Sequence, residues 1–199
     1  DYIRNIFDTN TIEGEPWSRY AAGYMWGTTG IVYNPEEISR EDASHWAILA
    51  DPQYKGQVTI KDNVRDSYFA ALGILHEEEL MELKDLDSGE RLERIAELMN
   101  RTDEGTVSAA EEILKLMKEN AYSFESDSGK ADMVTGKVLA NYQWSGDAVY
   151  TLDQAEIDDY ILAYAVPEES TNIWFDGWVM LKDGIEGDAA KTARGGSVY

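Results

Sequence analysis

The sequence predicts an α/β domain with three layers, in which helices cover both faces of a mainly parallel sheet. Short apolar runs with strand character alternate along the chain with segments that have helical spacing. A chain of 199 residues that is 43% apolar is also large enough to build one domain around a core. In sheets of this kind, ligands bind at the carboxyl ends of the strands.

The first half of the chain supplies two strands and two helices. Residues 23–33 (GYMWGTTGIVY) favour a strand with glycine interruptions, and residues 44–49 favour a short helix. Residues 56–60 (GQVTI) predict the second strand. A helix follows over 63–75, where the apolar residues have helical spacing and Asp62 or Asn63 suits the N-cap.

The middle of the chain is acidic and helical. Residues 77–87 carry many acidic side chains, and we interpret them as solvated surface. A helix is expected over 90–100, and a further helix over 108–117, because residues 108–111 (SAAE) have the pattern of a capping box.

The last third returns to strands. Residues 137–143 (KVLANYQ) predict a strand, and residues 144–147 (WSGD) the loop after it. A short helix is expected over 153–158, followed by strands over 160–166 and 173–181.

The charge of the chain limits its partners. The net charge is −22 and the sequence pI is about 4.2. Nucleic acid is therefore excluded as a partner, since phosphate binding needs clusters of Lys and Arg, and an anionic membrane surface is disfavoured. A cationic ligand suits the acidic field, although the same acidity could serve solubility alone.

The sequence gives little support to an enzyme. His45 and His76 are the only histidines and stand in unrelated polar contexts, and no HExxH, GxSxG, P-loop or GxGxxG motif occurs. We therefore expect neither catalysis nor a cofactor. We also expect no metal site, because EF-hand spacing and cysteine are both absent. A hydrolase that uses two carboxylates stays open as an alternative, since 39 acidic residues make close pairs common.

Trp174 and Asp176 form the most informative pair in the chain. Residues two apart on a strand share a face, so the indole and the carboxylate point the same way. An aromatic face beside a carboxylate suits an organic cation. The alternative is a core tryptophan next to a solvated aspartate.

Four more residues are candidates for a binding site. Trp144 follows a predicted strand and could form the wall of a pocket, or could belong to the core. Asn63 and Asp66 lie three apart at a predicted helix N-terminus, where capping is the alternative role of Asn63. Ser126 lies in a polar loop and could bond a ligand or cap a helix.

Taken together in order and spacing, these segments resemble the spermidine/putrescine-binding proteins of bacterial polyamine ABC transporters. The resemblance extends over roughly residues 1–190 and rests on an ordered set of short motifs: YMWGTTGI (24–31), YNP (33–35), Trp46, PQYKG (52–56), DNVRD (62–66), FESD (124–127), WSGD (144–147) and WFD (174–176).

The resemblance implies a fold of the type II periplasmic-binding-protein kind, with two α/β lobes that close on a ligand. Residues 29–176 would form the second lobe. Residues 1–28 would be a remnant of the first lobe with a crossover strand, and residues 177–199 a second crossover and a truncated remnant. Both ends of the chain are expected to be cuts in a longer protein.

The resemblance also implies site roles. Trp144 and Trp174 would enclose the methylene chain of a polyamine, and Asp176 would bind a central amine. Asp66 would bind a terminal ammonium, and Ser126 would add a hydrogen bond. Asn63 stands where spermidine-binding members carry Asp, which removes one anionic partner and leaves the preferred polyamine open.

The implied function is the solute-binding component of an ABC importer, with transporter permeases as partners. Its location would be periplasmic or extracellular, with a lipid anchor on an absent N-terminus as one possibility. A different cationic or amino-bearing solute on the same fold is the main alternative. The fragment alone would bind weakly, and its uncovered apolar surface would favour self-association.

Overall fold

The computed structural model describes residues 2–181. The chain divides into two compact units, of which one is Thr28–Asn172 and the other combines residues up to Gly27 with those from Ile173 onward. Within the described residues, none of the helices has the length and apolar character needed to cross a bilayer.

The sheet of the larger unit has the strand order β5-β4-β6-β3-β7. Its strands are β3 (Ala21–Tyr33), β4 (Val58–Lys61), β5 (Ser123–Glu125), β6 (Ala140–Trp144) and β7 (Ala163–Ala165). β4 pairs in parallel with both β5 and β6, whereas β3 is antiparallel to β6 and to β7. All strands on this path except β3 therefore run in one direction, and their carboxyl ends meet at the same edge.

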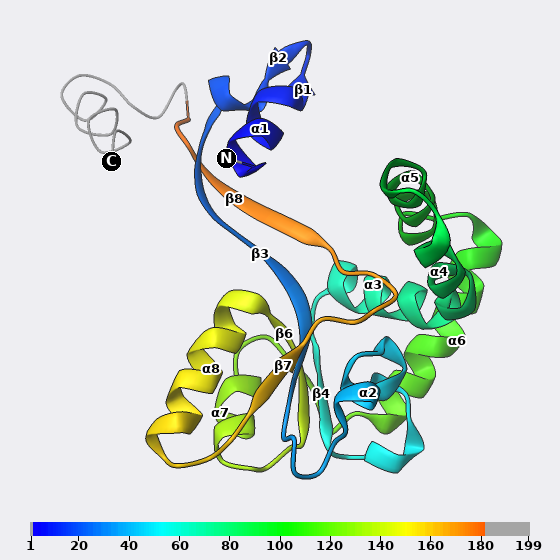
Figure 1. Cartoon of the computed structure of the whole chain (residues 1–199), viewed down its shortest axis with the longest axis vertical. Helices are drawn as coiled ribbons and strands as arrows, with labels where there is room; N and C mark the ends of the chain where they lie inside the picture. Colours follow the sequence, from blue (N-terminus) through cyan, green and yellow to red (C-terminus); the bar gives the residue numbers. More distant parts are fainter. Residues whose placement is uncertain (1, 182–199) are drawn as a thin grey trace. The chain divides into compact units, whose positions relative to one another are not determined.

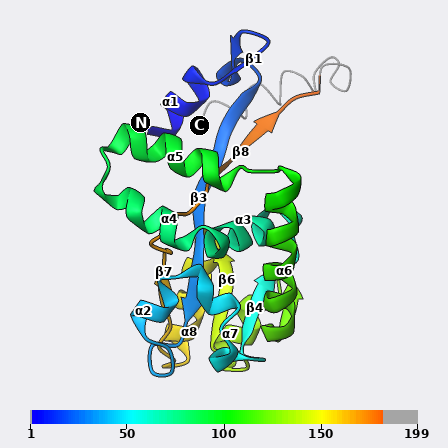
Figure 2. The same ribbon diagram turned by 90° about the vertical axis from the view of Figure 1, so that its right-hand side faces the viewer.

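Helices cover both faces of this sheet (Figure 1). α7 and α8 lie against one face, and α2, α3 and α6 against the other. Figure 2 shows α4 and α5 next to α3, with α6 running alongside. The bounds are α2 (Arg40–Ala43), α3 (Val64–Leu75), α4 (Glu77–Glu82), α5 (Ser88–Met99), α6 (Glu104–Asn120), α7 (Gly129–Val134) and α8 (Ser145–Ile157).

The core follows the alternation of the strands. On β3, Ile31 and Tyr33 belong to the larger cluster, while Val32 belongs to the smaller cluster on the opposite face with Met133 of α7. Trp46 is fully buried and packs edge-to-face against Tyr142 at 4.9 Å between ring centroids. Apolar packing on both faces fixes the register of the strands, and with it the positions of their carboxyl ends.

The smaller unit contains α1 (Tyr2–Thr9), the short hairpin β1 (Thr11–Ile12) and β2 (Glu15–Pro16), and β8 (Ile173–Val179), which pairs with β3. Phe175 of β8 packs against Phe7 and Trp17, with ring centroids 5.2 and 5.3 Å apart. This aromatic cluster takes one face of β8, so the residues on either side of Phe175 point to the other face.

The predicted α/β class with helices on both faces is confirmed. The start predicted for the helix over 108–117 is wrong: α6 begins at Glu104, and Asp103 caps it by accepting a bond from Thr106 N at 3.0 Å. Residues 145–147 are also not a loop, since they open α8 with Trp144 as the preceding cap residue. The assignment of residues 1–28, 29–176 and 177–199 to lobes stays a prediction, and its residues 182–199 lie outside the described part of the chain.

Candidate functional site

The carboxyl ends of three parallel strands bring together a set of polar side chains, which we term the strand-end cluster. β4 ends at Lys61, which lies opposite Glu125 at the end of β5. β6 ends at Trp144. The cluster consists of Lys61, Asp66, Glu125, Asn141 and Trp144.

A buried ion pair forms the base of the cluster. Lys61 has no exposed surface, and its Nζ lies 3.1 Å from Glu125 Oε1. Asn141 Nδ2 donates to the same oxygen at 3.1 Å, and the Gly129 amide donates to Glu125 Oε2 at 3.0 Å. A buried pair with this many hydrogen bonds is held in one geometry, because losing either partner would leave an uncompensated charge.

Trp144 and Asp66 are joined directly. Trp144 Nε1 donates to Asp66 Oδ2 at 3.1 Å, and Lys61 Nζ lies 4.3 Å from the centroid of the Trp144 ring. Burial raises the pKa of Asp66 above its ordinary value, and the Trp144 hydrogen bond and the charges of Arg65 and Lys61 oppose that rise. Asp66 Oδ1 accepts no hydrogen bond from the residues that the structure describes. The cluster therefore holds a poorly solvated carboxylate with one oxygen available to a ligand.

Asn63 and Ser126 lie beside the cluster in different roles. Asn63 is the N-cap of α3, and its Oδ1 accepts from the Arg65 and Asp66 amides at 3.0 and 3.2 Å. The amide oxygen that a ligand would use is therefore engaged in capping. Ser126 is exposed in the bend after β5. Its backbone carbonyl accepts a hydrogen bond from Lys61 Nζ at 3.3 Å.

Trp174 and Asp176 lie within β8, in the smaller unit. Trp174 is half-buried and Asp176 is exposed. Both project from the face of β8 opposite Phe175, so the shared face predicted from their spacing is confirmed. Most of β8 is exposed.

A second polar cluster lies on the same unit as the strand-end cluster. We term it the connector cluster: His45, Glu77 and Glu169, where Glu169 belongs to the connector (residues 166–172) between β7 and β8. His45 Nδ1 lies 3.0 Å from Glu169 Oε1 and 3.3 Å from Glu77 Oε1. Burial raises the pKa of Glu169, and bonds from its own backbone and from His45 oppose the rise.

The connector cluster contains a pair of carboxylates, as the hydrolase alternative requires. Glu77 and Glu169 approach the same histidine nitrogen, and one of them has a raised pKa. Glu169, however, has no exposed surface, so it cannot reach a substrate. The pair gives no support to two-carboxylate hydrolysis.

Lys61 and Glu125 were missed by the sequence analysis. A lysine is ordinarily expected at the surface, and its partner lies 64 positions away. One signal was present: Lys61 directly follows three β-branched residues, Val58–Ile60, and ends a strand that is buried on both faces.

The chain belongs to the bacterial extracellular solute-binding protein family, whose profile matches residues 4–194. The resemblance expected from the ordered motifs is thereby confirmed. The fold agrees with two solved structures. A putative spermidine/putrescine ABC transporter protein from Listeria monocytogenes gives a TM-score of 0.72 at 25% identity, covering 95% of this chain and 50% of that one. The spermidine/putrescine substrate-binding protein of Streptococcus pneumoniae gives 0.66 at 26% identity, covering 90% and 47%.

Curated relatives agree with these structures. The spermidine/putrescine-binding periplasmic protein of Salmonella typhimurium is 26% identical over 162 residues, which is 81% of this chain and 40% of that protein. The putrescine/agmatine-binding protein of Pseudomonas aeruginosa is 28% identical over 182 residues, 85% of this chain and 44% of that protein. The chain thus spans less than half the length of these relatives.

Proposed function

We propose that the protein containing this chain is the polyamine-binding subunit of an ABC importer and works outside the cytoplasmic membrane with transporter permeases. The observation that carries the proposal is Asp66, a carboxylate only 9% exposed at the carboxyl ends of parallel strands, beside an indole and with one oxygen available. The printed names of the relatives, which describe spermidine and putrescine binding, support the same ligand class.

Asp66 suits a terminal ammonium group. A cation beside a poorly solvated carboxylate restores the charge interaction that burial removes. Lys61 cannot serve this purpose fully, since its Nζ is bonded to Glu125 and to the Ser126 carbonyl. The ligand ammonium would therefore be the partner of Asp66, and the Ser126 hydroxyl would add a neutral hydrogen bond.

Trp144 suits the hydrocarbon part of a polyamine. Lys61 already occupies one face of its ring, so methylene groups would pack against the opposite face. The bond from Nε1 to Asp66 fixes the ring orientation. A ring held in this way places a flat apolar wall next to an anion, and a polyamine carries matching methylene and ammonium groups.

Trp174 and Asp176 keep the roles that the resemblance implies, an aromatic wall and the partner of a central amine. Both lie on one face of β8, which gives the ring and the carboxylate a common direction. Asp176 should matter most among the residues outside the strand-end cluster, because it would pair with a charge, whereas Ser126 would add one neutral bond.

Calorimetric titration of the full-length protein with putrescine and spermidine tests the proposal. We expect one polyamine per protein, with Asp176→Asn weakening binding far more than Ser126→Ala. Equal losses in the two variants would contradict the assigned roles. No heat with either polyamine, while another solute binds, would refute the ligand class.

A second candidate is a different cationic or amino-bearing solute. Asn63 favours it, because its amide oxygen is used for capping and its side chain contributes no charge. A thermal-shift screen of amines, amino acids and amino sugars separates the two candidates, since a ligand that binds only the folded state raises the melting temperature.

A further inference from the structure

We propose that the connector cluster, His45, Glu77 and Glu169, is a site for one divalent transition-metal ion of the zinc type. One imidazole nitrogen and two carboxylates offer ligand atoms that all lie within 4.8 Å of one another. The site is separate from the strand-end cluster, and the proposal does not depend on which solute the protein binds.

The spacing of the ligand atoms fits a tetrahedral ion. Zinc binds imidazole nitrogen and carboxylate oxygen at about 2.0–2.2 Å, which places neighbouring ligand atoms roughly 3.4 Å apart. His45 Nδ1 lies 3.3 Å from Glu77 Oε1 and 3.0 Å from Glu169 Oε1. A mixed nitrogen and oxygen set favours zinc-type ions over magnesium and calcium, which prefer oxygen ligands alone.

Glu169 has an unsatisfied bonding capacity. Its side chain is fully buried, and Oε2 has no hydrogen-bond partner among the described residues. Oε1, by contrast, accepts from the Trp46 amide at 3.2 Å as well as contacting His45. Buried carboxylate oxygens are nearly always paired, because desolvation without a partner is costly. A cation bound through both oxygens of this carboxylate would supply the partner that Oε2 lacks.

The charge balance also points to a divalent ion. A metal-bound His45 is a neutral imidazole, so with both carboxylates ionised the site would carry a net charge of −2. One divalent cation balances this charge. The ion has a path inward, since the side chains of His45 and Glu77 are 25% and 39% exposed.

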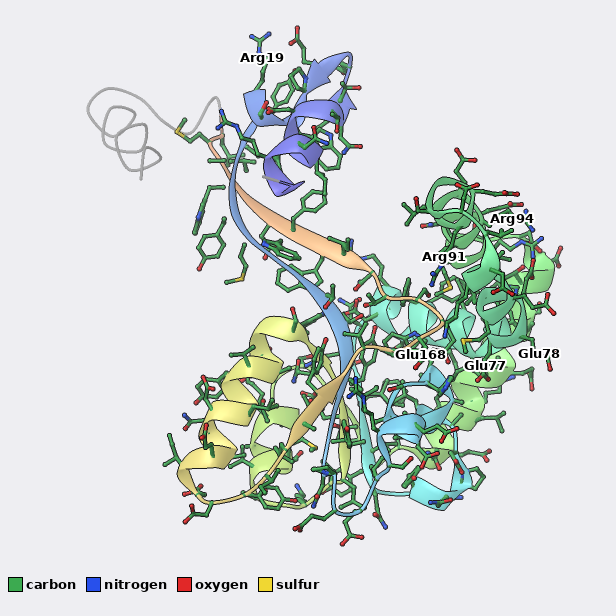
Figure 3. The ribbon with its side chains drawn as sticks, viewed as in Figure 1. Arg19, Glu77, Glu78, Arg91, Arg94 and Glu168 are labelled. Atoms are coloured by element: carbon green, nitrogen blue, oxygen red, sulfur yellow. The ribbon has the colours of Figure 1, made fainter. Side chains whose placement is uncertain are left out.

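The three ligands come from segments far apart in the sequence. His45 precedes a short 3-10 helix, Glu77 opens α4, and Glu169 lies in the connector that leads to β8. Figure 3 labels Glu77 and its neighbour Glu78, together with Glu168 of the connector. A bound ion would tie the connector to α4 and stabilise the folded chain.

Titration of the 199-residue chain with zinc chloride, followed by calorimetry, tests this site. We expect one zinc ion per chain, with affinity reduced at least tenfold in His45→Asn and in Glu77→Gln. Glu78→Gln is the matched control, since Glu78 is the next residue on the same helix, is exposed and should leave the affinity within twofold. Circular dichroism verifies that each variant is folded.

Cobalt supplies an independent readout. Stoichiometric Co²⁺ should give the intense visible absorption of a tetrahedral site in the wild type and Glu78→Gln, and zinc should remove it. Equal zinc uptake by all variants would show diffuse binding to the acidic surface and overturn the proposal. Absence of binding at one ion per chain would overturn it as well.

Discussion

The strand-end cluster and the connector cluster each contain a buried glutamate, and the two carboxylates differ in how their oxygens are hydrogen-bonded. Glu125 receives Lys61 and Asn141 on one oxygen and the Gly129 amide on the other. Glu169 Oε1 receives His45 and the Trp46 amide, whereas Oε2 has no hydrogen-bond partner among the described residues. A fully bonded carboxylate stabilises the fold, whereas a carboxylate with an unpaired oxygen has capacity for a cation.

The same comparison explains why we propose Asp66 as the ligand-binding acid of the strand-end cluster. Lys61 neutralises Glu125 within the cluster. Asp66 is then the acid whose charge no lysine or arginine pairs directly, although Lys61 and Arg65 act on it at longer range. Glu125 is thus held in a buried ion pair, and Asp66 is the acid that we propose binds the ligand.

Removing Lys61 should have the largest effect on stability. Lys61→Met leaves Glu125 buried without its cation and should lower the free energy of unfolding by about 3–5 kcal/mol. Lys115→Met is the control, because Lys115 forms exposed ion pairs, which contribute little to stability. Urea denaturation measures both, and a loss below about 1 kcal/mol in Lys61→Met would show that the pair is not structural.

Adding a methyl group at Gly129, at the base of the strand-end cluster, should have a smaller effect on stability. A Cβ added at Gly129 would press on Asn141 Nδ2 and lie 2.6 Å from Glu125 Oε1. Gly129→Ala should therefore cost about 1–3 kcal/mol of unfolding free energy. Gly146→Ala is a matched control, since nothing lies within 4 Å of its added Cβ, and it should be neutral or slightly stabilising. Equal stabilities for the two variants would contradict the packing described.

The pKa of Asp66 can be predicted for the ligand-free protein. Its pKa should exceed the ordinary 3.8, and Trp144→Phe should raise it further by removing the Nε1 donor that lowers it. Since the folded-state pKa is raised, the ligand-free chain should gain stability as pH falls through it. Carbon-detected NMR titration of the Asp66 carboxyl measures the value, with Tyr150→Phe as the unchanged control. A pKa at or below 3.8 would contradict the effect of burial.

Ligand preference should respond modestly to Asn63. Asn63→Asp keeps the N-cap and adds a negative charge beside the proposed ligand, so spermidine affinity should rise about tenfold, or roughly 1.4 kcal/mol. Asn63→Ser keeps a cap without the charge and serves as the control. Calorimetry on the full-length protein compares them. An unchanged spermidine affinity in Asn63→Asp would remove this residue from the site.

Part of the site could be predicted from the sequence. Asp66 and Trp144 each follow a predicted strand, and the carboxyl ends of parallel strands share an edge, so their proximity followed from the fold class. The hydrogen bond from Trp144 Nε1 to Asp66 confirms it. Asp62 and Asn63 were both candidates for the N-cap of an apolar helix, and Asn63 is the residue that caps α3.

The buried charges could not be predicted in the same way. Lys61 meets Glu125 only through the pairing of β4 with β5. Residues 123–125 (SFE) are too short to show the alternating pattern that predicts a strand. The packing of the connector brings Glu169 to His45, which also contacts Glu77. The connector has no periodic sequence pattern from which this packing could be predicted. The capping box at Ser108 led to a wrong start for α6, which is capped by Asp103 instead. When a sequence contains two possible N-caps, the local pattern does not show which of them the helix uses.

Asp66→Asn, measured for both ligand affinity and stability, tests the central claim most directly. We expect polyamine affinity of the full-length protein to fall about 10²–10³-fold, the equivalent of roughly 3–4 kcal/mol. The unfolding free energy of the ligand-free protein at neutral pH should rise, because a buried charge is removed. Asp62→Asn, at an exposed neighbouring carboxylate, should change neither by much. Unchanged polyamine affinity in Asp66→Asn would contradict the account.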